Sequence, residues 1–327
     1  MNVDFALIAD AARTLRPLVV ETPLLESPVL NGVAGCRVLV KAENLQRTGS
    51  FKYRGACFRL ARLSPDERKR GVIAFSSGNF AQALAAAGTA AGIAVTIVMP
   101  VDAPKAKIDA TRGYGAEVVL SEHGERNREE AANELAMKLA EQRGLVKLHP
   151  FDDPLVVAGQ ASCGVEIARQ AVERGVSLDA LVVPVGGSGL IAGIALAVKT
   201  LAPATRVVAA EPEGFDDLRR SLVSGTRERV VPGARSICDA LQAASPGAVP
   251  FGAARAAIAS GVAVSDAEAV AAMRAAFTHL KLVAEPSGAI GLGAVLSGML
   301  SPLPAAVGVV LSGGNVALAE FARLTAG

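Results

Sequence analysis

Short apolar runs alternate along the chain with longer stretches in which hydrophobic residues recur at helical spacing. Strands this apolar are typical of parallel sheets that helices cover on both faces. The alternation of strands and helices therefore predicts an α/β fold with parallel strands. The predicted strands are 37–41, 72–76, 95–99, 117–120, 181–185, 207–210 and 307–311.

Two helix starts carry an explicit signal. Ser64 and Ser265 are each followed three residues later by glutamate, which is the pattern of a capping box. The chain has 327 residues, enough for two lobes and a sizeable core. The two prolines in the segment 149–154 predict a turn, and a lobe boundary is expected there.

Composition narrows the functional classes. A net charge of +2 gives no case for nucleic-acid binding. The most apolar stretch, 81–100, is interrupted by Gly88 and Gly92, so it is interpreted as a helix and a strand and not as a membrane span. The N-terminus lacks a basic segment, so a signal peptide is not expected. The four cysteines have no paired spacing, and reduced thiols in the cytoplasm are the expectation.

The segment 41–56, KAENLQRTGSFKYRGA, contains the main candidate for chemistry, Lys52. A lysine amine becomes a nucleophile when burial or a neighbouring cation removes its proton. The small residues before it let a planar ligand approach the backbone closely. By itself the segment favours the alternative interpretation, an ordinary surface lysine at a helix start. The three histidines show no triad or zinc spacing and are interpreted as structural.

Three further segments each follow a predicted strand. SSGNFAQ at 76–82 opens an alanine-rich helix, where backbone N–H groups favour an anion. GGSG at 186–189 exposes N–H groups that suit a phosphate, but it fits neither the dinucleotide fingerprint nor a P-loop. SGGN at 312–315 is the third. Alone, each also fits an ordinary cap or turn.

In this order the motifs resemble those of fold-type II pyridoxal-phosphate (PLP) enzymes, in particular the serine/threonine dehydratase and serine racemase family. The resemblance extends from TPL at 22–24 to SGGN at 312–315. It implies a tryptophan synthase β-like fold of two lobes, each with a largely parallel twisted sheet flanked by helices. Residues 1–62 and 148–327 would form the large cofactor-binding lobe and 63–147 a small mobile lobe. A homodimer is expected, and a C-terminal regulatory domain is not.

The resemblance also implies roles for single residues. Lys52 would bind PLP covalently and act as the catalytic base, together with Ser77 as a second catalytic residue. The cofactor site would further comprise Phe51, Asn79, Gly186, Gly187, Ser188, Gly189, Glu285 and Ser312. The substrate site would comprise Ser76, Ser77, Phe80 and Arg128, with Arg126 as a competitor for the last position.

Four of these positions bear on the reaction. Ser312 would contact the pyridine nitrogen, and a hydroxyl there makes the ring a weaker electron sink than a carboxylate would. This favours elimination of a β-hydroxyl. Ser77 stands where racemases of the family have a serine opposite the lysine, so it permits racemisation. Phe80 replaces the usual histidine and Ser188 replaces a glycine, which leaves room for an unusual substrate.

The segment 211–217, EPEGFDD, matches the family's cation site. Glu211, Asp217 and the Phe215 carbonyl are oxygen ligands of the kind that suits Mg²⁺ or Ca²⁺. The alternative interpretation is a solvated acidic loop.

The function predicted from these residues is PLP-dependent dehydration and deamination of L-threonine or L-serine to a 2-oxo acid and ammonia. The alternatives are a serine racemase or a hydroxyaspartate dehydratase. From another class, a non-catalytic α/β protein that binds a phosphate ligand is possible if Lys52 is an ordinary helix lysine.

Overall fold

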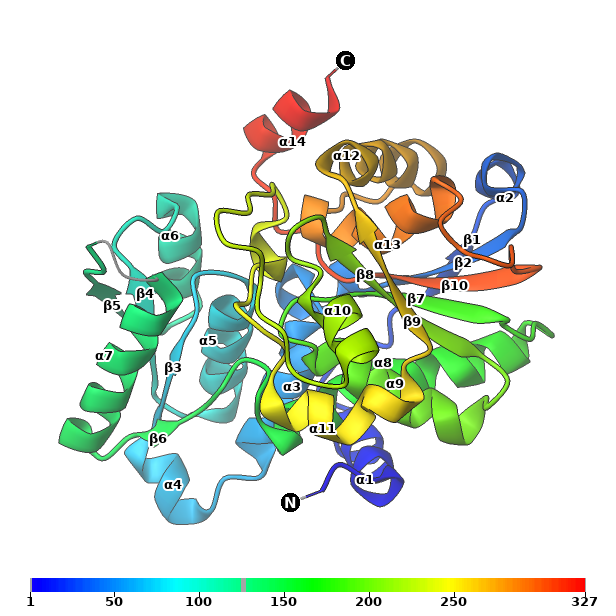
Figure 1. Ribbon diagram of the computed structural model, residues 1–327. Helices are drawn as coiled ribbons and strands as arrows, with labels where there is room; N and C mark the ends of the chain where they lie inside the picture. Colours follow the sequence, from blue (N-terminus) through cyan, green and yellow to red (C-terminus); the bar gives the residue numbers. More distant parts are fainter. Residues whose placement is uncertain (1, 125–127, 327) are drawn as a thin grey trace.

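The computed structural model describes residues 2–124 and 128–326 and contains two β-sheets (Figure 1). The larger sheet has the strand order β1-β2-β10-β7-β8-β9. In it β1 pairs antiparallel with β2, and the other neighbours pair parallel. Its strands, in that order, are Leu24–Glu26, Arg37–Ala42, Ala306–Leu311, Ala180–Pro184, Arg206–Pro212 and Ser260–Val264.

The smaller sheet has four parallel strands in the order β5-β4-β3-β6. In that order they are Glu117–Ser121, Val95–Pro100, Val72–Phe75 and Val146–Lys147. They all come from residues 72–147, whereas the larger sheet combines strands from before and after this segment. Two separate, largely parallel sheets confirm the predicted α/β architecture. The exact lobe boundaries, and the mobility of the small lobe, stay predictions.

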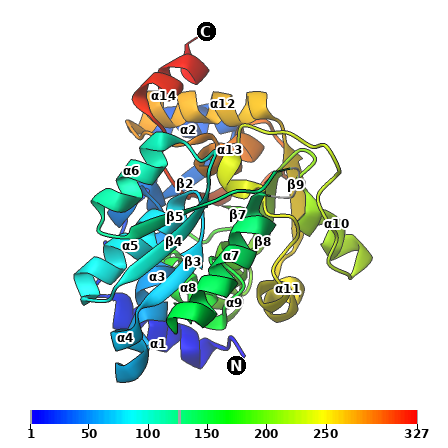
Figure 2. The same cartoon turned by 90° about the vertical axis from the view of Figure 1, so that its left-hand side faces the viewer.

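Helices cover both faces of each sheet (Figures 1 and 2). In chain order, α1 to α7 are Phe5–Leu15, Pro28–Ala34, Lys52–Ala61, Pro65–Arg70, Asn79–Ala91, Lys105–Gly113 and Arg128–Arg143. Helices α8 to α14 are Pro154–Glu173, Gly189–Leu201, Asp217–Ser224, Ala248–Ala254, Asp266–Ala275, Pro286–Leu296 and Leu318–Thr325. One core lies between the larger sheet and α1, α3, α8 and α9 and continues to α5 on the smaller sheet. A second joins the opposite face of the larger sheet to α12 and α13, and a third packs α7 on β3 and β4.

All seven predicted strands are present, as are both capping boxes. Strands β3, β4, β7 and β10 are buried along their whole length, which explains their uninterrupted apolar sequence. The sequence missed β1, β6 and β9. Strands β1 and β6 have three and two residues, and β9 is a half-exposed edge strand, so none carries a strong apolar pattern.

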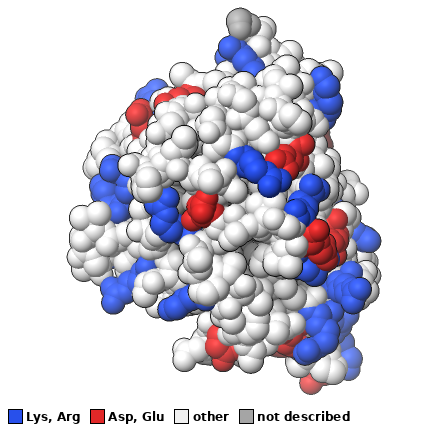
Figure 3. All heavy atoms as spheres, turned by 90° about the vertical axis from the view of Figure 1, so that its right-hand side faces the viewer, with Lys and Arg blue, Asp and Glu red and all other residues white. Residues whose placement is uncertain are grey.

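The distribution of charge on the surface does not indicate a particular function. In Figure 3, positive and negative side chains are interspersed over the face shown. None of the helices in the described part of the chain is long and apolar enough to cross a membrane. The cytoplasmic location and the homodimer stay predictions.

Candidate active site

A cavity of about 520 Å³ lies at the carboxyl ends of strands from both sheets. Strands β3, β7 and β10 each lead directly into a loop that lines it. In α/β folds such an edge is where ligands bind. Among its lining residues are Phe51, Lys52, Ser76, Ser77, Asn79, Phe80, Arg128, Gly186, Gly187, Ser188, Gly189, Phe215, Glu285 and Ser312. The fold therefore brings together every candidate cofactor and substrate residue within the described ranges.

Lys52 is the first residue of α3, and its Nζ donates a hydrogen bond to the carbonyl of Pro150 over 3.0 Å. The amine lies 5.2 Å from the ring centroid of Phe51, 5.9 Å from that of Phe80 and 6.0 Å from that of Phe151. Three aromatic rings thus surround the predicted nucleophile, a position where a cation or a planar ligand is favoured.

The turn before Lys52 packs directly on the loop that follows β10. Thr48 and Gly49 have left-handed backbone conformations, and a Cβ on Gly49 would lie 2.3 Å from Oδ1 of Asn315. Phe51 N–H donates to the carbonyl of Ser312 over 3.1 Å. Glycine at 49 is required both for its positive φ and for this close approach. Two motifs far apart in the sequence therefore form one wall of the cavity.

Asn79 links three of the predicted motifs. It begins α5, and its Nδ2 donates to Oε1 of Glu285 over 2.6 Å. Its Oδ1 accepts from Asn315 Nδ2 over 2.7 Å, and the same amide donates to the carbonyl of Thr48. Burial raises the pKa of Glu285 to about 7, with a contribution from Asp239. The sequence assigned no role to Asn315, whose contacts only the fold reveals.

The loop 186–189 leads from β7 into the 13-residue helix α9. Ser188 has a left-handed backbone (φ 69°), and its buried Oγ has no hydrogen-bond partner among the described residues. A Cβ on Gly187 would lie 2.3 Å from the ring of Phe151, so the loop has no room for a side chain there. An unpaired hydroxyl beside the N-terminus of a long helix fits a phosphate group, which needs donors and favours the positive end of the helix dipole.

The substrate candidates lie on the side of the smaller sheet. Arg128 begins α7, lines the cavity and pairs with Oδ1 of Asp102 over 3.1 Å. Its competitor Arg126 lies outside the described residues. Lys107 and Asp239, which also line the cavity, form an ion pair between the smaller-sheet side and the larger-sheet side. The sequence did not indicate this pair, because each residue alone looks like a surface charge.

The candidate cation ligands lie beside the cavity. Both carboxylate oxygens of Glu211 accept backbone N–H groups, from Leu218 and Arg219. Burial, with the charge of Asp217, raises the pKa of Glu211 to about 8, and burial raises that of Asp217 to about 7. Oδ2 of Asp217 is buried and finds no hydrogen-bond partner in the described part of the chain. Two buried carboxylates with an orphaned oxygen fit a hard cation. Within 2–124 and 128–326, however, no group of three acidic, histidine or cysteine side chains converges, so further ligands would be carbonyls or water.

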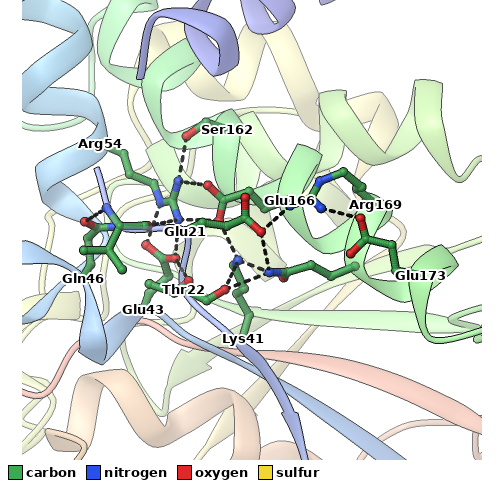
Figure 4. Close-up of polar contacts among 12 residues, drawn as sticks. Glu21, Thr22, Lys41, Glu43, Gln46, Arg54, Ser162, Glu166, Arg169 and Glu173 are labelled. Carbon is green, nitrogen blue, oxygen red and sulfur yellow. Dashed lines mark hydrogen bonds and ion pairs between the residues drawn. The ribbon is translucent and has the colours of Figure 1, made fainter. Parts of the chain in front are cut away.

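A buried polar network anchors the helix that begins with Lys52 (Figure 4). The guanidinium of Arg54 makes two hydrogen bonds to Glu43 and two to Glu166, all of 2.7–2.8 Å. Lys41 Nζ donates to Glu166 and to the carbonyl of Thr22. Arg54, Lys41 and Glu43 are fully buried, and the network balances two positive with two negative charges.

Comparison with known proteins agrees with this geometry. The family described as "Pyridoxal-phosphate dependent enzyme" matches residues 15–313. The chain is 39% identical to a serine racemase from Arabidopsis thaliana, over 97% of this chain and 95% of that protein. It is 37% identical to an L-threo-3-hydroxyaspartate ammonia-lyase from Saccharomyces cerevisiae, over 98% and 95%. The crystal structure of a threonine deaminase from T.th. superimposes with a TM-score of 0.90 at 42% identity, over 96% of this chain and 99% of that one.

The matched region includes both sheets and the cavity between them. The cofactor that names the family fits this cavity, which offers the unpaired Ser188 hydroxyl, the glycine loop and Lys52. The chain therefore belongs to the fold-type II pyridoxal-phosphate dependent enzymes, in the group that includes serine racemases and threonine and hydroxyaspartate ammonia-lyases.

Proposed function

We propose that this enzyme dehydrates and deaminates L-threonine or L-serine to a 2-oxo acid and ammonia. The observation that carries the proposal is the position of Lys52 Nζ among three aromatic rings, in the same cavity as the glycine loop and Ser312. When bound, PLP withdraws electrons from the α-carbon of an attached amino acid.

The residues of the chain have separate tasks in this reaction. The loop 186–189 and the N-terminus of α9 would hold the phosphate, and Ser312, which lines the same cavity, would meet the pyridine nitrogen. Lys52 Nζ holds the cofactor before the substrate arrives and afterwards takes the α-proton of the substrate. The N–H groups at the start of α5, together with Arg128, bind the substrate carboxylate.

An uncharged β-substituent suits the cavity best. Its walls include the rings of Phe75, Phe80 and Phe151 and the small residues Ala243 and Ala244. Besides Lys52, the cations that line the cavity in the described part of the chain are Lys107 and Arg128, and each is paired with an aspartate. Because Arg128 is assigned to the α-carboxylate, a second substrate carboxylate, as in hydroxyaspartate, would have to compete with Asp239 for Lys107. This favours threonine or serine over the hydroxyaspartate alternative.

Racemisation is the second candidate, and Ser77 is the observation that favours it. Ser77 lines the same cavity as Lys52, so the two side chains provide two groups that can exchange a proton at the α-carbon. Measuring 2-oxo acid release and the enantiomers of serine in one reaction separates the two activities. A Ser77→Ala enzyme is expected to keep 2-oxo acid formation and lose D-serine formation.

The test of the main proposal is turnover of L-threonine by wild-type and Lys52→Ala enzymes. We expect the wild type to release 2-oxo acid and ammonia in equal amounts, and the variant to lose at least about a thousandfold in kcat, because one group supplies both cofactor attachment and proton removal. A Lys52→Ala enzyme that turns over at the wild-type rate would refute the proposal. Wild-type protein that binds pyridoxal phosphate without turnover of any of these amino acids would favour the non-catalytic alternative.

A further inference from the structure

One short turn contacts both ends of the cofactor site. The carbonyl of Pro150 accepts the hydrogen bond from Lys52 Nζ. The next residue, Phe151, packs closely against the glycine loop: a Cβ on Gly187 would lie 2.3 Å from its ring, and a Cβ on Gly189 would lie 3.1 Å from its Cβ. The backbone of the turn 149–152 therefore sets where the lysine amine lies relative to the phosphate loop.

The side chain of His149 closes this turn. Its Nδ1 accepts the backbone N–H of Asp152 over 2.9 Å and that of Phe151 over 3.4 Å. Its ring meets those of Phe75 and Phe151 edge-on, with centroids 5.3 and 4.6 Å apart. An imidazole nitrogen can accept two N–H groups only when it carries no proton, so the ring must be neutral and protonated at Nε2.

The surroundings of His149 keep it neutral. Burial lowers the pKa of His149 to about 4. Of the charged groups that face it, Lys147 and Lys52 lower this pKa, and Asp152 and Asp153 raise it. Nδ1 therefore remains an acceptor at the pH at which such an enzyme works.

We propose that His149 is a positioning residue for Lys52: by accepting two N–H groups at Nδ1, it aims the Pro150 carbonyl at the lysine amine and the Phe151 ring at the phosphate loop. Pro150 and Phe151 line the cavity. His149 is not among the described residues that line it, so it acts through these two neighbours. The inference rests on the proposed role of Lys52.

The chain allows a matched pair of substitutions. In His149→Asn the amide oxygen is attached to Cγ, as Nδ1 is, so the acceptor stays at the right place. In His149→Gln the oxygen is one bond farther out, nearer to the position of Nε2. Both variants are uncharged amides of similar polarity, and they differ mainly in where the acceptor lies.

Both variants are measured as cofactor-loaded enzymes with L-threonine. We expect His149→Asn to keep kcat within about threefold of wild type, and His149→Gln to lose more than about tenfold in kcat, with KM changed less than about threefold. The pH at which the near-visible absorbance of the Lys52-bound cofactor titrates should shift in His149→Gln and stay unchanged in His149→Asn. His279→Gln, on the 276–280 helical segment, whose residues do not line the cavity, is the control for loss of a histidine.

Equal activity of the two amides, whether high or low, would overturn the inference. If His149→Gln does not fold, His149→Asn decides alone: a folded, cofactor-loaded protein with kcat below a tenth of wild type contradicts the positioning role. Wild-type enzyme without a chromophore on Lys52 would instead refute the proposed function, so the two failures are distinguishable.

Discussion

Replacing Glu43 with glutamine is expected to destabilise the protein strongly, because it leaves the buried network with two positive charges and a single negative charge, that of Glu166. Glu43 and Arg54 are both fully buried, and two hydrogen bonds of 2.7 and 2.8 Å join them. A glutamine amide would also turn N–H donors toward the guanidinium. Breaking a buried pair on one side costs about 3–5 kcal/mol.

The same network contains a matched control. Glu173 pairs with Arg169 at the surface, where their side chains are 55% and 45% exposed (Figure 4). Exposed pairs of this kind contribute about 0.3–0.5 kcal/mol. Glu173→Gln therefore makes the same chemical change at a site where solvent already screens the charge, and little loss is expected.

The assay is thermal unfolding of the cofactor-loaded proteins at pH 7. With an unfolding entropy of about 2.1 cal/mol/K per residue over 327 residues, the loss in Glu43→Gln corresponds to a fall in Tm of about 4–7 °C. Glu173→Gln should lower Tm by less than about 1 °C. Equal Tm values for the two variants would refute the conclusion that the buried pair stabilises the start of α3.

The pH dependence gives a second check on the same pair. Burial by itself raises the pKa of Glu43, but the charge and hydrogen bonds of Arg54, together with Lys41 and Thr22, outweigh it and hold that pKa below its ordinary value. A carboxylate with a lowered pKa contributes stability above its unfolded pKa, about 4.5, and loses it as the pH falls through the folded value. The Tm difference between wild type and Glu43→Gln should therefore shrink below pH 4.5.

Three other perturbations have expected outcomes. The pKa of His149 is lowered to about 4, so its contribution to stability is present above pH 6.5 and is lost as the pH falls toward 4. Urea unfolding of the wild type should therefore show a loss of up to about 3 kcal/mol in unfolding free energy over that pH range. His149→Asn should lack this loss. Millimolar Ca²⁺ or Mg²⁺ should raise the Tm of wild type and not of Glu211→Gln, and equal shifts in both would exclude this cation site. Gly187→Ala should weaken pyridoxal-phosphate binding at least tenfold, because the added Cβ would lie 2.3 Å from the Phe151 ring. The control Gly252→Ala, with open space around its added Cβ, should bind pyridoxal phosphate normally.

The sequence predicted the fold well where burial dictates residue type. The strands β3 and β10 are buried on both faces, so they stand out as apolar runs between polar turns. The edge strand β9 is half exposed and alternates too weakly to be recognised. The motifs predicted that each candidate residue stands at the end of a strand or helix, and in the structure those ends line the cavity.

Contacts between the motifs could not be read from the sequence. His149 and Pro150 suggested only a structural histidine and a lobe boundary, because the contact with Lys52 spans 98 residues of chain and exists only in the folded protein. Asn315 is similar: its bond to Asn79 crosses from one sheet to the other. Arg54 resembles a surface charge beside the lysine until the fold buries it between Glu43 and Glu166.

The most direct measurement of the central claim is an absorbance spectrum of the purified protein before and after borohydride reduction, followed by peptide mapping. We predict a near-visible band that borohydride removes and a cofactor that becomes fixed to the peptide containing Lys52. Cofactor fixed to another lysine, or no chromophore after incubation with pyridoxal phosphate, would contradict the assignment of Lys52 as the residue on which the reaction depends.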